Sequence, residues 1–82
     1  MLTNTAVDRR ARALCVQLAR VTEAGSMQWR TARLIVTAAG LDESAAYTAI
    51  AYAIRMGWLI LERDPPQSFC LTEAGRILSA TT

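Results

Sequence analysis

Arginine is the residue type in this chain that is best suited to binding an anion. It supplies all nine basic side chains, and neither lysine nor histidine is present. Arg30 and Arg33 lie near the start of the segment TARLIVTAA, which has the apolar pattern of a short helix. Free backbone amides at a helix N-terminus and guanidinium groups both attract anions. These two arginines therefore favour the binding of a phosphate group.

A second group of arginines belongs to a helix predicted over residues 6–24. Arg9, Arg12 and Arg20 share one face of this helix, and Arg10 lies beside that face. Two interpretations stay open. The arginines form a solvated surface, or they contact a partner or a phosphate group.

The usual residues of catalysis and metal binding are missing. The sequence has no histidine, no glycine-rich phosphate loop, no serine or cysteine beside a recognisable base, and no carboxylates at a spacing that suggests acid–base work. Cys15 and Cys70 lie in apolar patterns, so we expect small buried thiols, with a disulfide or a metal site as the alternative. A structural zinc site is excluded because histidine and CxxC are absent. We expect no enzyme, no bound metal and no cofactor.

The two tryptophans also have two interpretations. Trp29 and Trp58 could line a ligand pocket, but each falls where a short strand should cover the core. Their positions favour structural packing.

Length and composition predict one domain over residues 1–82, with residues 1–5 frayed. The most apolar segments, residues 34–36 and 58–61, are far shorter than the ~18 residues of a membrane span. The N-terminal sequence MLTNTAVDRRAR lacks the apolar run of a signal peptide, so we expect a cytoplasmic location and no membrane partner. The net charge of +2 permits an anionic partner without requiring one.

Apolar periodicity, with glycine and proline as breaks, predicts the order helix, short strand, helix, helix, strand, turn, strand and helix. The corresponding ranges are 6–24, 27–29, 31–39, 41–57, 58–62, 63–67, 68–71 and 72–79. Glycines at 25, 40 and 57 end the first three helices. Side-chain oxygens that can accept bonds from first-turn amides are the predicted N-caps, namely Thr31, either Asp42 or Ser44, and Thr72.

The predicted core consists of apolar side chains at helical spacing. They are Val7, Ala11, Leu14, Leu18 and Val21 in the first helix, Leu34, Ile35, Ala38 and Ala39 in the second, Ala46, Ala49, Ile50, Ala53 and Ile54 in the third, and Ile77 and Leu78 in the last.

Three segments of the chain resemble the winged helix-turn-helix domains of bacterial transcription regulators. They are AAGLDES between the second and third helices, RMGWLILER where the third helix enters the hairpin, and FCLTEAGRIL where the second strand enters the last helix. In MarR-type and PadR-type regulators the second wing strand closes with leucine and threonine, two further residues, and glycine and arginine, much as residues 71–76 do here. The resemblance covers roughly residues 8–79. It implies a mainly α fold with a small β-hairpin (α+β), in which a three-helix core carries a two-stranded wing and a short C-terminal helix.

The resemblance also implies a small bacterial transcription regulator that binds double-stranded DNA, with the third helix in the major groove and the wing on the flanking backbone. The residues of the third helix that would face the DNA are Ser44, Ala45, Tyr47, Thr48, Ala51, Tyr52 and Arg55. Serine and threonine can bond to base edges, alanine can meet a thymine methyl group, and tyrosines can reach phosphates. Further phosphate contacts would come from Arg30, Arg33 and Arg63.

A protein partner is the alternative for the same surface. Two tyrosines with few charges are typical of an interface core, so the chain could be an adaptor module without sequence-specific DNA binding, or a weak homodimer. The placement of the arginines separates the two functions. DNA binding is favoured if the functional surface is lined by Arg33, Arg55 and Arg63 around the third helix. Binding of a protein partner is favoured if the arginines of the first helix line that surface in their place.

Overall fold

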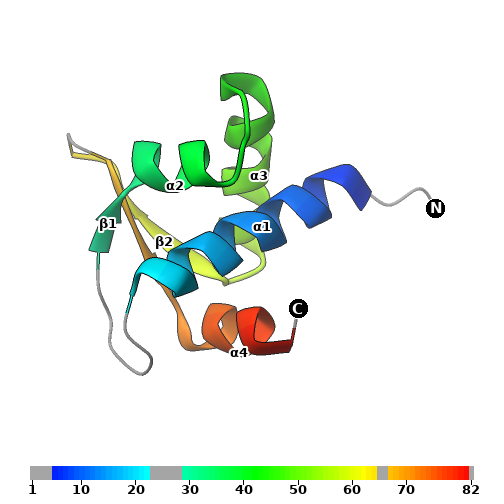
Figure 1. Ribbon diagram of the computed structural model, residues 1–82, viewed down its shortest axis with the longest axis vertical. Helices are drawn as coiled ribbons and strands as arrows, with labels where there is room; N and C mark the ends of the chain where they lie inside the picture. Colours follow the sequence, from blue (N-terminus) through cyan, green and yellow to red (C-terminus); the bar gives the residue numbers. More distant parts are fainter. Residues whose placement is uncertain (1–4, 23–28, 65–66, 82) are drawn as a thin grey trace.

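The order of helices and strands is the one predicted from the sequence periodicity (Figure 1). The computed structural model describes residues 5–22, 29–64 and 67–81. These residues form helices α1 (Thr5–Val21), α2 (Ala32–Ala38), α3 (Glu43–Arg55) and α4 (Glu73–Thr81), and strands β1 (Trp29–Thr31), β2 (Leu59–Glu62) and β3 (Ser68–Leu71). The described part of the chain is therefore mainly helical, with a small antiparallel sheet.

In the described residues the sheet has three strands in the order β1-β3-β2, and both pairings are antiparallel. Cys70 of the central strand pairs with Trp29 of β1 on one side and with Ile60 of β2 on the other. The predicted hairpin is confirmed as β2 and β3. Strand β1 extends it, so the sheet is larger than the expected two-stranded unit.

The start of α2 differs from the prediction because β1 runs further than expected. Residues 27 and 28 lie outside the described part, and the strand continues from Trp29 through Arg30 and Thr31, both paired with β3. Thr31 is the N-cap residue of α2, as predicted, with φ of −57° and ψ of 130°, but its side chain makes no capping hydrogen bond. Instead, the amide of Ala32 donates to the carbonyl of Gln67 at 2.8 Å, which ties the start of α2 to the hairpin.

The other predicted caps are confirmed. The carboxylate of Asp42 accepts a hydrogen bond from the amide of Ala45 at 2.8 Å at the start of α3, so aspartate is the cap of the two predicted candidates. The hydroxyl oxygen of Thr72 accepts from the amide of Gly75 at 3.0 Å at the start of α4. Each cap satisfies an amide that has no partner within its helix.

Two of the three predicted glycine breaks are confirmed. Gly40 and Gly57 follow α2 and α3 with φ of 72° and 78°, a left-handed conformation that glycine adopts without steric cost. The third, at residue 25, lies outside the described residues, as do residues 1–4 of the segment expected to fray. Helix α1 begins at Thr5, within the segment expected to fray, and ends at Val21, before the predicted end at residue 24.

The core lies where α1, α3 and the inner face of the sheet meet. Its buried side chains are Ala11, Leu14, Cys15 and Leu18 of α1, Ala32 and Ile35 of α2, Ala49 and Ala53 of α3, and Trp58, Leu59, Phe69 and Leu71 of the sheet region. Most predicted core positions of α1 and α3 are thereby confirmed. Val7 and Ile50 are half-buried.

Several predicted core residues are exposed instead. Leu34 and Ala38 point outward because α2 buries the stripe that contains Ala32 and Ile35, and adjacent residues of a helix point about 100° apart. Val21, Ile54 and Ile77 are also exposed, whereas Leu78 packs against the core.

The tryptophans have different environments. Trp58 is buried in the core, as predicted. Trp29 is 46% exposed, which corrects the prediction of core packing. Trp29 belongs to an edge strand and shares the outer face of the sheet with its partner Cys70, whereas Leu59 and Leu71 pair on the inner face.

Both cysteines are buried and free, as expected for small apolar side chains. Burial raises the pKa of the Cys15 thiol to about 12, against a smaller opposing effect of the Arg12 charge. Burial also raises the pKa of Cys70. Because the thiolate is the reactive form, burial makes both thiols less reactive than an exposed cysteine.

None of the helices in residues 5–22, 29–64 and 67–81 combines the length and the apolar character needed to cross a membrane.

Candidate functional site

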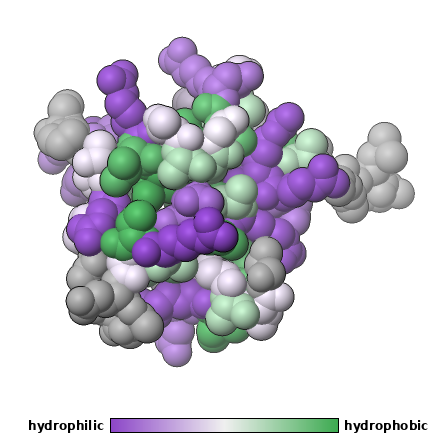
Figure 2. All heavy atoms as spheres, in the orientation of Figure 1, coloured by the Kyte–Doolittle hydropathy of each residue, from purple (hydrophilic) through white to green (hydrophobic). Residues whose placement is uncertain are grey.

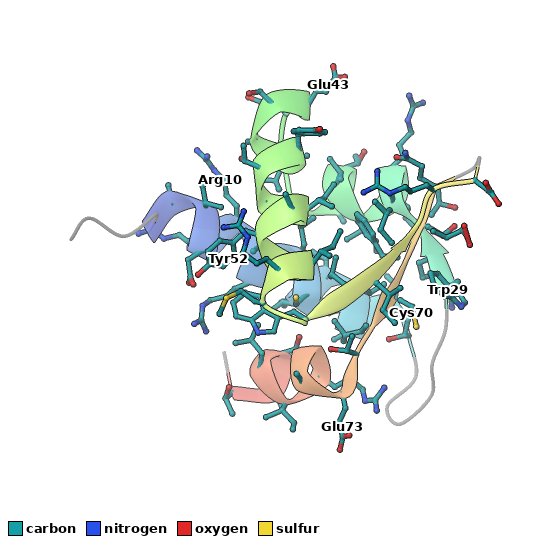
Figure 3. All side chains as sticks on the ribbon, turned by 180° about the vertical axis from the view of Figure 1, so that it is seen from behind. Arg10, Trp29, Glu43, Tyr52, Cys70 and Glu73 are labelled. Carbon is teal, nitrogen blue, oxygen red and sulfur yellow. The ribbon has the colours of Figure 1, made fainter. Side chains whose placement is uncertain are left out.

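Helix α3 presents an exposed stripe along its outer side. Ser44, Thr48, Ala51 and Arg55 follow one another at intervals of four, three and four residues, and all four side chains are exposed. The opposite side is buried against the core, and Figure 3 shows the outer side of the helix with Glu43 at its N-terminal end. These four of the seven residues predicted to face DNA therefore lie together on the surface as one stripe.

The two tyrosines of α3 have different roles. Tyr47 is 78% exposed. Tyr52 is half-buried, its hydroxyl donates to the Asp8 carboxylate at 2.6 Å, and its ring meets that of Trp58 edge to face at 5.7 Å. The expectation that Tyr52 faces outward is corrected, because α1 packs against this side of α3. Ala45, also expected to face outward, is half-buried.

A polar cluster formed by Asp8, Arg12, Tyr52 and Trp58 joins α1 to α3. Arg12 donates to Asp8 at 2.6 Å, and its guanidinium lies 5.3 Å from the centre of the Trp58 ring. The hydrogen bond from Tyr52, and then the one from Arg12, lower the pKa of Asp8. The same bond with Asp8 raises the pKa of Tyr52. This cluster fixes how α3 is set against α1.

The cluster predicts a dependence of stability on pH. The pKa of Asp8 is lower in the folded chain than its ordinary value of 3.8. The Asp8 carboxylate therefore contributes its full stabilisation above that ordinary value, and this stabilisation is lost as the pH falls through the pKa of the folded chain. We therefore expect Asp8→Asn to make the free energy of unfolding fall less steeply on acidification below about pH 5. Urea unfolding at several pH values measures this slope.

Tyr52→Phe removes the largest cause of the lowered pKa of Asp8, so it should flatten the same slope while leaving the Arg12 bond in place. Identical slopes in wild type and both variants would contradict a stabilising role for the cluster.

The predicted arginines are not equivalent. Arg33, Arg55 and Arg63 are exposed. Arg30 is half-buried in β1, and its Nε donates to the carbonyl of Val21 at 3.1 Å, so it closes the C-terminal end of α1. Arg30 therefore has a structural role, and its phosphate contact stays a prediction.

Two hollows flank Tyr47. One lies between α2 and α3, where its lining includes Arg33, Gln67 and Ile50, and the other lies at the N-terminal end of α3. Glu43 lines both hollows, so a carboxylate stands close to the stripe at this end of the helix. Arg55, at the opposite end, makes the surface of α3 electrostatically asymmetric.

The arginines of α1 had two open interpretations, a solvated surface or a contact with a partner or a phosphate group. Arg9, Arg10 and Arg20 are exposed, whereas Arg12 belongs to the cluster with Asp8. Figure 3 shows Arg10 on the same flank of α3 as Tyr52. Helical spacing within α1 does not predict that Arg10 lies beside α3, because this placement depends on how α1 crosses α3.

On the face drawn in Figure 2, hydrophilic side chains predominate and apolar side chains form small patches between them.

We compared the chain with protein-family models, with curated proteins and with solved structures, and none of the three comparisons found a significant match.

Proposed function

We propose that this chain is a winged-helix domain that binds double-stranded DNA and acts as a small bacterial transcription regulator. The observation that carries the proposal is the exposed stripe of α3, which ends in Arg55, together with the exposed Arg33 of α2, which lines the same hollow as Tyr47. In this arrangement α3 enters the major groove, and the β2–β3 hairpin with Arg63 lies on the flanking backbone.

The dimensions and the chemistry of α3 support this use. An α-helix with its side chains is about 10–12 Å wide, and the major groove of B-form DNA is about 12 Å wide. Ser44 and Thr48 can bond to base edges, and Ala51 can meet a thymine methyl group. The hydroxyl of Thr48 donates to the Ala45 carbonyl at 3.1 Å, so its oxygen acts toward DNA as an acceptor.

The number of exposed arginines sets the expected affinity. Arg33, Arg55 and Arg63 supply three phosphate contacts, for which log K falls with log salt at a slope of about −2.7. The affinity then drops about 40-fold between 50 and 200 mM salt, and each further phosphate contact steepens the slope by about 0.9. Binding by one copy is therefore modest, and a weak homodimer on paired half-sites would bind more tightly.

The test is an NMR titration of the labelled protein with a GC-rich duplex of about 20 base pairs, at about 50 and 200 mM salt. We expect shifts concentrated on residues 44–55, Arg33 and Arg63, and weaker at the higher salt. An absence of shifts at low salt would reject DNA binding.

A protein partner is the second candidate, and the surroundings of Tyr47 favour it. An exposed tyrosine between two hollows is suited to a protein interface, and the carboxylates of Asp42 and Glu43 repel phosphates. The Asp42 carboxylate caps α3, so Glu43 is the free charge with which to separate the two functions.

Glu43→Gln should tighten DNA binding by about twofold to fivefold at low salt, because it removes one exposed repulsive charge. Fluorescence anisotropy with a labelled duplex measures the change, and Glu73→Gln, in the first turn of α4, is the matched control. A partner protein with a basic surface would instead bind the Glu43 variant more weakly.

A further inference from the structure

The two flanks of α3 are covered by different helices. Tyr47 and Tyr52 are five residues apart, so their side chains leave the helix about 140° apart on opposite sides of the exposed stripe. Tyr47 lines the hollow that also contains Arg33 of α2. Tyr52 is bonded to Asp8 of α1. The stripe therefore runs between α2 on one side and α1 on the other.

Each flank carries an exposed arginine. Arg33 is on the α2 side, and Arg10 is on the α1 side, as Figure 3 shows. Neither forms an ion pair with a carboxylate of the described residues. Asp8, the acid nearest to Arg10 in sequence, has both oxygens engaged, one by Arg12 and one by Tyr52. The charge of Arg10 is thus available to an external anion.

We infer that Arg10 binds a backbone phosphate on one wall of the DNA major groove while Arg33 binds a phosphate on the opposite wall. The inference rests on the proposed function and adds a contact from α1 to it. The phosphates of the two strands line the two edges of the groove, so a helix inside the groove has one row of phosphates along each flank. Arginine suits this role because its planar fork of N–H donors matches phosphate oxygens.

The polar cluster sets Arg10 in place for this contact. The bond between Asp8 and Tyr52 joins α1 to α3 directly and fixes the turn of α1 that also contains Arg10, whose side chain leaves the helix about 160° around from that of Asp8. Arg20, by contrast, lies about 15 Å further along α1, at 1.5 Å per residue. Of Arg10 and Arg20, Arg10 therefore has the functional position and Arg20 belongs to the solvated surface.

The test compares Arg10→Gln with the matched control Arg20→Gln, since each removes one exposed charge from the same helix. The dissociation constant for a generic duplex of about 20 base pairs is measured by anisotropy between about 50 and 200 mM salt. Four contacts predict a wild-type slope of about −3.6, and the Arg10 variant should have a slope of about −2.7. Its affinity should fall about 15-fold at 50 mM and about fourfold at 200 mM. Arg20→Gln and the charge-conserving Arg10→Lys should keep the wild-type slope.

The outcomes separate the two proposals. Equal slopes for wild type and Arg10→Gln, or equal losses for the Arg10 and Arg20 variants, would overturn the role of Arg10 and leave DNA binding in place. No binding by the wild type at 50 mM salt would overturn both proposals. Thermal melting of each variant excludes unfolding as the cause of a lost affinity.

Discussion

Replacing Gly75 with alanine should destabilise the protein by about 3 kcal/mol or more, although alanine is the better helix former by about 1 kcal/mol. A Cβ atom at Gly75 would overlap the carbonyl oxygen of Trp58 and would lie 2.7 Å from Cδ1 of Leu71. The Trp58 carbonyl is backbone, and it already accepts a hydrogen bond from the amide of Thr72 at 3.0 Å. Helix α4 would have to move away from the sheet, with loss of the packing of Leu78.

Urea unfolding measures this change, and Ala74→Gly is the control. Ala74 is exposed in the first turn of α4, so the reverse substitution there should cost no more than about 1 kcal/mol through helix propensity. A Gly75→Ala variant as stable as the wild type would mean that α4 is not packed as closely on Trp58 as described.

Under the proposed DNA-binding function, Arg55→Gln combined with Thr48→Ala should weaken the binding of DNA by about 30-fold to 100-fold at 50 mM salt without changing the melting temperature. Loss of the Arg55 phosphate contact accounts for about 15-fold, and loss of one hydrogen bond from Thr48 accounts for the rest. Both side chains are exposed, so neither substitution leaves a gap in the core. Anisotropy with a labelled duplex gives the affinity, and thermal melting tests the fold.

The matched control is Arg20→Gln with Thr81→Ala, which makes the same chemical changes at exposed positions of α1 and α4. We expect the control to keep most of the wild-type affinity. A double variant on α3 that binds DNA as tightly as this control would remove α3 as the reading helix.

The secondary structure was largely predictable because its signals are local. Gly40 and Gly57 end helices, and Asp42 and Thr72 begin them, through contacts within a few residues. Strand β1 was only partly predicted. Arg30 becomes a strand residue by pairing with Phe69 of β3, 39 positions further along the chain. Such pairing depends on the tertiary fold and leaves no periodic pattern.

The candidate site was predictable to the same extent. Helical spacing alone placed Ser44, Thr48, Ala51 and Arg55 on one exposed stripe, and the structure confirms their exposure. Spacing failed for Tyr52, whose partner Asp8 is 44 residues away on another helix. Arg10 was left unassigned for the same reason, since its position beside α3 follows from the crossing of two helices.

The small size of the side chains on the α3 stripe has a consequence for any molecule that binds there. Alanine loses no side-chain freedom on ordering, and serine and threonine lose less than the long charged side chains, which lose up to about 2 kcal/mol each. Ordering most of this strip therefore costs little conformational entropy. The same short side chains also have little reach, so a bound surface must approach the backbone of α3 closely, above all at Ala51.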